Sequence, residues 1–297
     1  MGAFFGPLPF LFWVLLFGSG CEVIDPKEKT PSFIKVQNPT VKTDPSIEGS
    51  NSHDIQYGWV YVDDQLQGVY ELPAKVLTSK SGVRNVKVRA GIHENGIIKE
   101  KIPYPFYRTF SMDTNLRSGK STVVEPEFRY YDQQDISIWV EDFNNPNTVQ
   151  VLARPSSDTL LEVTQSNDKT FEGAGSGKIP ITNERDYFLG ASDGNFQFDV
   201  GNEVFLELDY KTSDTLNVGL LAKYPQKTLK RSLVNLNATR RSDGSLYWNK
   251  VYIRLTPIVG EESEASEFEV FIQSTLQTGV SQGTILIDNF KVLYQDG

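Results

Sequence analysis

Few residues of this chain could carry out chemistry. Cys21 is its only cysteine, His53 and His93 are its only histidines, and its 38 acidic residues show no spacing that singles out a catalytic pair. Neither histidine lies near a nucleophile motif such as G-x-S-x-G. The sequence therefore predicts a protein that is not an enzyme. A glycoside hydrolase is the least favoured alternative. Its two catalytic carboxylates must lie at a set distance in the folded protein, and the sequence does not indicate such a pair.

Cys21 follows an apolar run, Phe4 to Phe17, that ends in Gly18-Ser19-Gly20. An apolar run closed by small residues is typical of a signal peptide and its cleavage site, here over residues 1–20. The arrangement resembles the lipobox of bacterial lipoproteins. That resemblance implies a diacylglycerol on the Cys21 sulfur, cleavage before Cys21, and acylation of the new amino group. Two or three acyl chains would give stable membrane anchoring. An uncleaved anchor and a plain secretory signal are the alternatives.

The charge of the chain limits its partners. The net charge is -9, and no charged residue precedes position 22. This sign argues against nucleic acid and against anionic lipid head groups as partners. No second apolar stretch approaches the roughly 20 residues of a membrane span. We therefore expect membrane contact through the lipid on Cys21 alone, with residues 21–31 as a lipidated tether.

Short alternating runs rich in Phe, Tyr, Val and Ile, separated by Gly, Asn, Asp and Pro, predict an all-β chain. The length favours two domains, and we expect two β-sandwiches in series, at 32–138 and 139–297. The boundary is placed at Trp139, where an apolar strand runs into Asn144-Asn145-Pro146. In the run Val204 to Tyr210, Glu207 and Asp209 alternate with apolar residues, which predicts a strand with one face in water.

The first domain resembles small β-sandwich modules of the PEGA or carboxypeptidase-regulatory type. The resemblance rests on Val62-Asp63, Gly68, Pro73 and Gly82, followed by a strand that ends at Gly91. Such modules are scaffolds without catalytic chemistry.

An aromatic and proline-rich segment follows, with Tyr104, Phe106 and Tyr107 beside Pro103 and Pro105. The prolines remove backbone donors and keep the segment out of a central strand. The three rings either form a contact patch for a partner or close the base of the first sandwich as ordinary core.

The second domain resembles jelly-roll carbohydrate-binding modules and galactose-binding-like domains. Three segments carry the resemblance in order: Glu172 to Ile179, Trp248 to Leu255, and Gly283 to Val292. The resemblance implies a structural calcium ion held by Asp288 with Glu141 and Asp142. The alternative is that Asp288 accepts backbone hydrogen bonds at a turn.

Sugar binding needs aromatic rings flanked by polar groups. In the second domain the aromatic candidates, which lie beside loop signals, are Tyr187, Phe188, Tyr224, Tyr247 and Trp248. Trp248 also belongs to a strand motif, in which core packing is the alternative.

Together these features resemble outer-membrane lipoproteins of Bacteroidota. The function predicted first is a non-catalytic, lipid-anchored binding or assembly subunit, with an outer-membrane protein as partner and no nucleic acid. The second is a glycan-binding protein that uses the jelly-roll domain. An aromatic platform would favour glycan binding, whereas a broad exposed apolar patch would favour assembly.

Overall fold

The computed structural model describes residues 1–2 and 30–295. Within these residues the chain forms strands β1 to β21 and one short helix, α1 (Thr256–Glu261). The prediction of an all-β fold built from β-sandwiches is confirmed. Cys21, the signal peptide and most of the tether lie outside the described residues. In the part of the chain that is described, no helix is long and apolar enough to cross a membrane.

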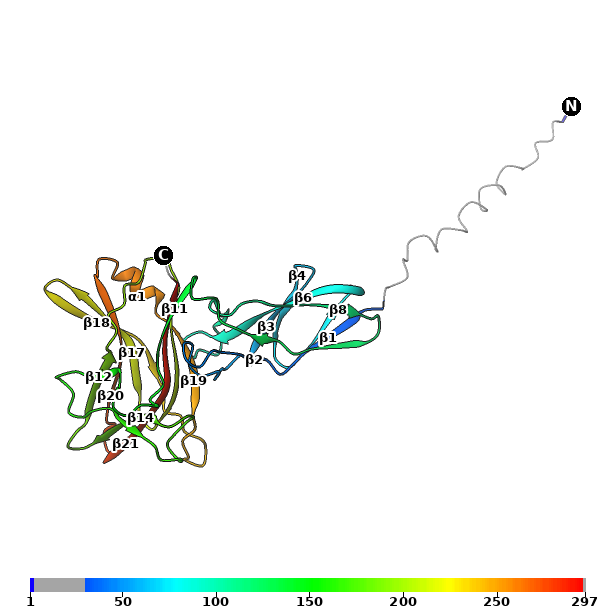
Figure 1. Ribbon diagram of the computed structural model, residues 1–297. Coiled ribbons are helices and arrows are strands. Elements are labelled where there is room, and N and C mark those ends of the chain that lie inside the picture. The colour runs from blue at the N-terminus through cyan, green and yellow to red at the C-terminus, as the bar shows by residue number, and fades with distance from the viewer. Residues whose placement is uncertain (3–29, 296–297) are drawn as a thin grey trace.

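The first domain contains β1 to β10, arranged in two main sheets (Figure 1). In the larger sheet the order is β4-β3-β6, and both β7 and β8 pair with β6. In the smaller sheet β1 lies between β5 and β9, and a separate pair joins β2 to β10. The strands are β1 (Ser32–Val36), β2 (Thr40–Val41), β3 (Tyr57–Val62), β4 (Gln65–Glu71), β5 (Ala74–Thr78), β6 (Gly82–His93), β7 (Lys101–Pro103), β8 (Phe110–Leu116), β9 (Ser121–Val124) and β10 (Glu127–Phe128).

The β3-β4 hairpin and strand β6 follow directly from the sequence pattern. Asp63 and Asp64 connect β3 to β4 with positive φ angles of 49° and 62°, the conformation that a two-residue hairpin turn requires. In β6, Val86, Val88 and Ala90 are buried on one face, as the period-two alternation predicts. Residues 87 and 89 therefore lie on the opposite face of the sheet.

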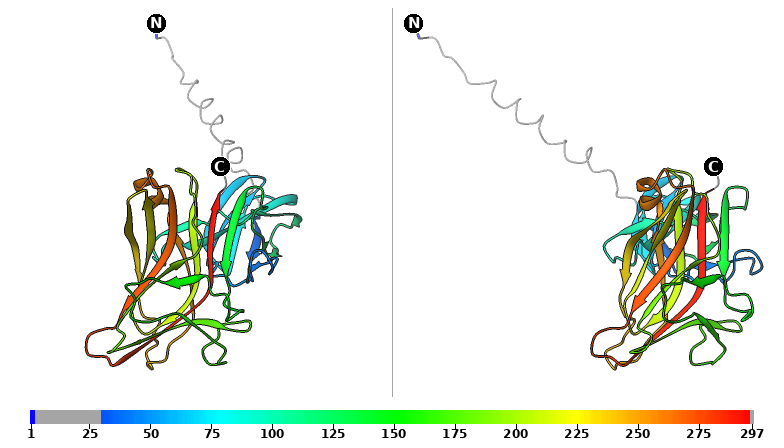
Figure 2. Two further views of the ribbon diagram at one scale, coloured as in Figure 1. Left: turned by 60° about the vertical axis from the view of Figure 1, so that its left-hand side comes forward. Right: turned by 90° about the vertical axis from the view of Figure 1, so that its left-hand side faces the viewer.

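The second domain is a sandwich of two antiparallel sheets. One has the order β13-β14-β21-β16-β19, with β11 also paired to the long strand β21, and the other has the order β12-β15-β20-β17-β18. Figure 2 shows the two layers from other sides, with the red strand β21 in the layer nearer the first domain. The strands are β11 (Ile136–Glu141), β12 (Val151–Ala153), β13 (Glu162–Thr164), β14 (Ser176–Thr182), β15 (Tyr187–Ser192), β16 (Val204–Thr212), β17 (Leu216–Tyr224), β18 (Lys227–Leu236), β19 (Asn249–Arg254), β20 (Glu267–Thr275) and β21 (Gln282–Gln295).

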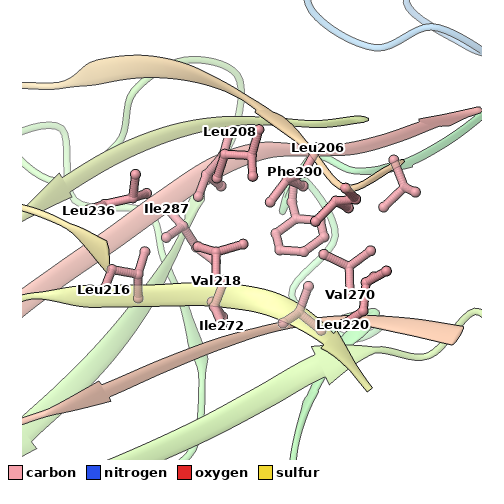
Figure 3. Packing of buried hydrophobic residues seen from close by; sticks show 14 of the residues in the cluster. Leu206, Leu208, Leu216, Val218, Leu220, Leu236, Val270, Ile272, Ile287 and Phe290 are labelled. Carbon is pink, nitrogen blue, oxygen red and sulfur yellow. The ribbon is translucent and has the colours of Figure 1, made fainter. Parts of the chain in front are cut away.

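The core of the second domain lies between these sheets. Leu206 and Leu208 of β16 meet Val218 and Leu220 of β17 and Ile272 of β20, and all five are fully buried (Figure 3). Each such side chain contributes about 1.5–3 kcal/mol through removal from water. The alternation that places these residues inward sends their neighbours on β16 to the outer face of the sheet.

The first domain covers that outer face. A single buried cluster joins Phe106, Tyr107 and Phe128 of the first domain to Phe205 and Tyr252 of the second. Glu207 and Asp209, expected to face water, are only 0% and 1% exposed. The prediction of a half-exposed β16 is therefore wrong, because the first domain, and not solvent, covers its polar face.

The junction also changes the expected boundary. Strand β11 begins at Ile136 and pairs with the C-terminal half of β21. Ile136 itself packs in the cluster shared by the two domains. The chain therefore enters the second domain's sheet three residues ahead of the boundary expected at Trp139.

Candidate functional site

The aromatic residues of the proline-rich segment lie between the two domains. Tyr104, Phe106 and Tyr107 are 2%, 0% and 4% exposed. The Tyr104 ring centroid lies 4.8 Å from that of Tyr252 and 5.4 Å from that of Phe205. These rings form the core of the domain interface and do not form an exposed contact patch.

A cluster of buried charges lies at the same interface. Lys250 Nζ is 3.1 Å from Glu207 Oε2 and 3.4 Å from Asp209 Oδ2. The hydroxyls of Tyr104 and Tyr130 in the first domain donate to Glu207 Oε1 at 2.7 and 2.9 Å. We call Glu207, Asp209, Lys250 and Lys291 the interface charge cluster. It ties the domains together through Tyr104 and Tyr130 of the first domain.

The charged state of the cluster follows from its contacts. Burial alone would raise the pKa of Glu207, but Lys250, Lys291 and the two tyrosine hydroxyls outweigh it, so the pKa is lowered. Burial lowers the pKa of Lys291 to about 8, against the opposing attraction of Glu207. The Lys291 ammonium donates to the backbone carbonyl of Ser50 in the first domain. Glu207 is therefore the ionised centre on which both domains converge.

The carboxylates expected to hold calcium have other roles. Both oxygens of Glu141 accept backbone N–H groups, from Phe143 and Gln150. Asp288 accepts the Ser176 hydroxyl at 2.6 Å and the Asn289 N–H at 2.8 Å. Among the residues that the structure describes, no group of three or more His, Cys, Asp or Glu side chains is placed to hold a metal ion. Asp288 thus accepts one hydrogen bond from β14 and one from the residue that follows it in β21, and the calcium ion stays a prediction.

Asp142 and Asp288 nonetheless line one cleft of about 540 Å³ between the domains, together with Glu172 and Lys42. Burial, together with the nearby carboxylates of Asp209 and Glu172, raises the pKa of Asp288 to about 7 against the opposing effect of its hydrogen bonds. This cleft is polar and acidic, without an aromatic ring among its lining residues.

The aromatic candidates of the second domain are dispersed. Phe188 is fully buried, Tyr247 lines a cleft between the domains, and the other three lie apart from one another. Tyr187 pairs with Thr275 at one end of β20, whereas Tyr224 lies near Glu267 at the other end of that strand. The Tyr224 hydroxyl donates to Glu262 at 2.6 Å. Trp248 directly precedes β19 of the other sheet and packs on Phe171, with ring centroids 5.2 Å apart. These residues do not form one platform.

The first domain carries an aromatic face that the sequence analysis missed. Strand β3 alternates, so Val60 and Val62 point into the core while Tyr57, Trp59 and Tyr61 point outward from the larger sheet. Their cross-strand neighbours on β4 are Glu71, Val69 and Leu66, and on β6 they are Gly91, Arg89 and Lys87. We define the aromatic face as Trp59, Tyr61, Leu66, Val69 and Arg89.

The side chains of this face are accessible. Leu66 and Val69 are 54% and 44% exposed, Arg89 is exposed, and Trp59 and Tyr61 are half-buried. Strand β3 has aromatic residues on one face and valines on the other, so it is apolar on both sides. This pattern was the signal in the sequence from which an exposed aromatic face could have been predicted. Large apolar residues grouped on an exposed sheet face indicate a binding surface.

Gly91 shapes the centre of the face. A Cβ atom at Gly91 would lie 2.2 Å from Trp59 Cζ3 and 2.8 Å from Tyr57 Cβ. The absence of a side chain at Gly91 therefore lets the indole ring lie against the backbone of β6. Such packing holds one side of the ring in a fixed orientation while the residue stays partly exposed.

At the Tyr57 end, the aromatic face continues into a cleft between the domains. We call this space, of about 440 Å³, the junction cleft. Asp54, Glu71 and His93 line it from the first domain, and Tyr247 and Asn249 line it from the second. His93 Nε2 lies 3.0 Å from the Tyr57 hydroxyl. Tyr57 and Glu71 of the cleft are the next positions on the same side of β3 and β4 after Trp59 and Val69, so the face and the cleft adjoin.

Comparisons with known proteins give no family. No family model matches the sequence, and no curated protein matches it. Solved structures with a similar fold include a family 61 carbohydrate-binding module in complex with β-1,4-galactotriose, at 13% identity, over 49% of this chain and 87% of that chain, with a TM-score of 0.31. Another is the family 30 module of a Clostridium thermocellum cellulosomal cellulase, at 14% identity, over 55% of this chain and 94% of that chain, with a TM-score of 0.32.

A larger protein is also among the similar structures. An arabinose-bound GH51 α-L-arabinofuranosidase matches at 16% identity and a TM-score of 0.36 over 48% of this chain, but this chain spans only 23% of that enzyme. The similarity of about half of the chain to β-sandwiches of the carbohydrate-binding-module type is therefore one of fold.

Proposed function

We propose that this chain is a non-catalytic carbohydrate-binding protein, held at the outer membrane by acylation of Cys21. The observation that supports the proposal is the aromatic face of the first domain, continuous with the polar junction cleft. The predicted function of assembly with an outer-membrane protein becomes the second candidate.

The aromatic face has the chemistry that sugar rings require. A pyranose ring presents C–H groups on its faces and hydroxyls around its edge, so it packs on an aromatic ring and hydrogen-bonds to polar groups beside it. Trp59 and Tyr61 supply the rings, and Glu71, Asp54 and Asn249 supply polar groups at the end of the row. Tyr57 is only 4% exposed, so the accessible rings of β3 are Trp59 and Tyr61, which lie about 6.5 Å apart as successive outward residues of a strand. That spacing suits contact with neighbouring sugars of an extended chain.

The interface charge cluster supports a binding role of this kind. Because buried tyrosines and charges join the domains, the junction cleft has walls from both domains in one fixed arrangement. A preformed cleft avoids the entropy cost of ordering its walls when a ligand binds.

Affinity electrophoresis of the full chain in gels that contain soluble polysaccharides tests the proposal. We expect at least one polysaccharide to retard the protein, and Trp59→Ala to weaken that binding about tenfold, because a lost stacking platform removes about 1.5 kcal/mol. Tyr187→Ala is the matched control, since it removes a half-buried aromatic from the second domain. Equal retardation of Trp59→Ala and wild type would contradict the assignment to the first domain, and loss in Tyr187→Ala would move it to the second.

One observation favours the second candidate. Leu66 and Val69 are exposed next to a tryptophan and an arginine, and Trp and Arg are enriched at the centres of protein interfaces. Purification of the tagged lipoprotein from membranes tests this function. A protein partner that is lost with Trp59→Ala, in the absence of any polysaccharide binding, would favour assembly.

A further inference from the structure

The aromatic face carries cations that have no anionic partner. Arg89 is the cross-strand neighbour of Trp59, and directly paired residues in a sheet have Cβ atoms about 5 Å apart. No ion pair or side-chain hydrogen bond involves the Arg89 guanidinium among the described residues. The guanidinium is therefore free to meet a ligand that lies on the indole ring.

A second cation lies one step along the row. Lys101 Nζ is 4.3 Å from the centroid of the Tyr57 ring, and Lys101 is exposed. In the described part of the chain it has no carboxylate partner. Arg89 and Lys101 thus flank the row from the same side, since both lie on strands that follow β3 in the sheet order β3-β6-β7.

These two cations contrast with their surroundings. The neighbouring Lys87 is paired with Asp64 at 2.5 Å, and Arg84 with Asp63 at 3.2 Å. The chain as a whole has a net charge of -9. Unpaired cations beside an aromatic platform, on a protein that otherwise repels anions, indicate a ligand with negative charges at the edges of its rings.

We propose that the aromatic face binds an acidic polysaccharide, in which a sugar carboxylate lies against Arg89 while the ring of the same sugar packs on Trp59. This inference rests on the proposed function and names its ligand class. The planar guanidinium matches a carboxylate with two parallel N–H donors, which a neutral hydroxyl does not. Lys101 supplies a second positive charge toward the Tyr57 end. Glu71 marks the limit of the acidic subsite, because it places a negative charge on the opposite side of Tyr57.

The test compares each acidic polysaccharide with its own neutral form. Polygalacturonate, alginate and hyaluronan are used beside the same polymers after carboxyl reduction, with the full chain in affinity electrophoresis at low salt. At least one acidic polymer should bind at least tenfold more tightly than its reduced form, because hydrogen bonds to a charged group contribute about 1.5–3 kcal/mol. The preference should shrink when salt is raised, because salt screens charges at the surface.

Variants separate this inference from the proposed function. Arg89→Gln should lose the preference for the acidic polymer about tenfold and keep the weaker binding of the reduced polymer, whereas Trp59→Ala should lose both. Arg117→Gln, which removes an exposed arginine in the turn after β8, is the matched control and should behave as wild type.

Two results would overturn the inference. If wild type and Arg89→Gln bind the acidic and reduced polymers equally, carbohydrate binding stands and the acidic ligand is wrong. If no acidic polymer binds, the inference is also wrong, and capture of a membrane protein that depends on Trp59 would then favour assembly.

Discussion

Glu207→Gln tests whether the interface charge cluster couples the two domains. The substitution keeps the size of the side chain and its ability to accept the Tyr104 and Tyr130 hydroxyls. It removes the negative charge that faces Lys250. Lys250 then retains only Asp209, at 3.4 Å, and both lysines of the cluster stay buried.

The expected loss of stability is large. Glu207 Oε2 lies 3.1 Å from Lys250 Nζ, and at an effective dielectric constant of about 20 the attraction at that distance is about 5 kcal/mol. The loss of one partner from a buried ion pair costs about 3–5 kcal/mol, since the remaining charge stays out of water. For a domain of about 200 residues this corresponds to a fall in Tm of about 10 °C.

Thermal and urea unfolding of the full chain measure the effect. Glu127→Gln is the control, because Glu127 pairs with Arg129 at the surface, where both side chains are about half exposed, and surface pairs contribute less than about 1 kcal/mol. The double variant Glu207→Gln with Lys250→Met should recover part of the loss, because it removes both charges.

The pH dependence gives an independent check. Because the pKa of Glu207 is lowered in the folded state, its stabilisation is present above the pKa of the unfolded chain and is lost as the pH falls through the folded value. The difference between wild type and Glu207→Gln should therefore be large at pH 7, begin to shrink near the ordinary glutamate pKa of 4.5, and vanish only below the lowered pKa of the folded state. A loss below 1 kcal/mol at pH 7, equal to that of Glu127→Gln, would refute the coupling of the domains through this cluster.

Two further predictions concern Asp288 and Cys21. Burial raises the pKa of Asp288 to about 7 from 3.8, so between these values the folded chain binds more protons than the unfolded chain and its stability falls as pH rises. Asp288→Asn should therefore gain in Tm relative to wild type from pH 5 to pH 8, and an equal difference at both pH values would contradict this. Cys21→Ala should move the protein out of the membrane fraction or leave an uncleaved precursor, as measured by fractionation and mass spectrometry. Unchanged membrane association with normal processing would exclude lipidation.

Most of the fold could be predicted because buried and exposed side chains alternate along a strand, so apolar residues recur at every second position. Strand β6 illustrates this, since the alternation of Val86, Val88 and Ala90 with polar residues matches their burial. Strand β16 shows the limit. The sequence pattern predicts that Glu207 and Asp209 are exposed, because it separates the polar from the apolar face of the strand. It does not show that a buried lysine and two tyrosine hydroxyls contact the polar face.

The candidate site was less predictable for two reasons. Aromatic residues beside loop signals, such as Tyr187 and Tyr224, are candidates for a platform from the sequence, but the strand pairing places them at opposite ends of β20. The aromatic face arises within one strand, where Trp59 would read as core. The position of its indole ring depends on Gly91 of β6, because a side chain there would collide with the ring. This is a cross-strand contact, so its prediction requires knowledge of how β3 and β6 are paired.

The domain interface and the aromatic face are linked by the junction cleft. Tyr57 and Glu71 belong to the first domain and Tyr247 and Asn249 to the second, so the shape of the cleft depends on how the domains are joined. The interface charge cluster fixes that arrangement with Lys250, which itself lines the cleft. A polysaccharide long enough to pass from Trp59 into the cleft would therefore meet both domains.

This linkage gives a prediction that separates a rigid two-domain site from a site confined to one sheet. Glu207→Gln leaves the aromatic face unchanged and loosens only the interface. At a temperature where the variant is folded, we expect weaker binding of long polysaccharide chains and unchanged binding of an oligosaccharide of two or three sugars, which covers Trp59 and Tyr61 alone. Isothermal titration with chains of increasing length measures both. Equal loss for short and long chains would mean that the substitution disturbs the first domain itself, and no loss for either would mean that the junction cleft takes no part in binding.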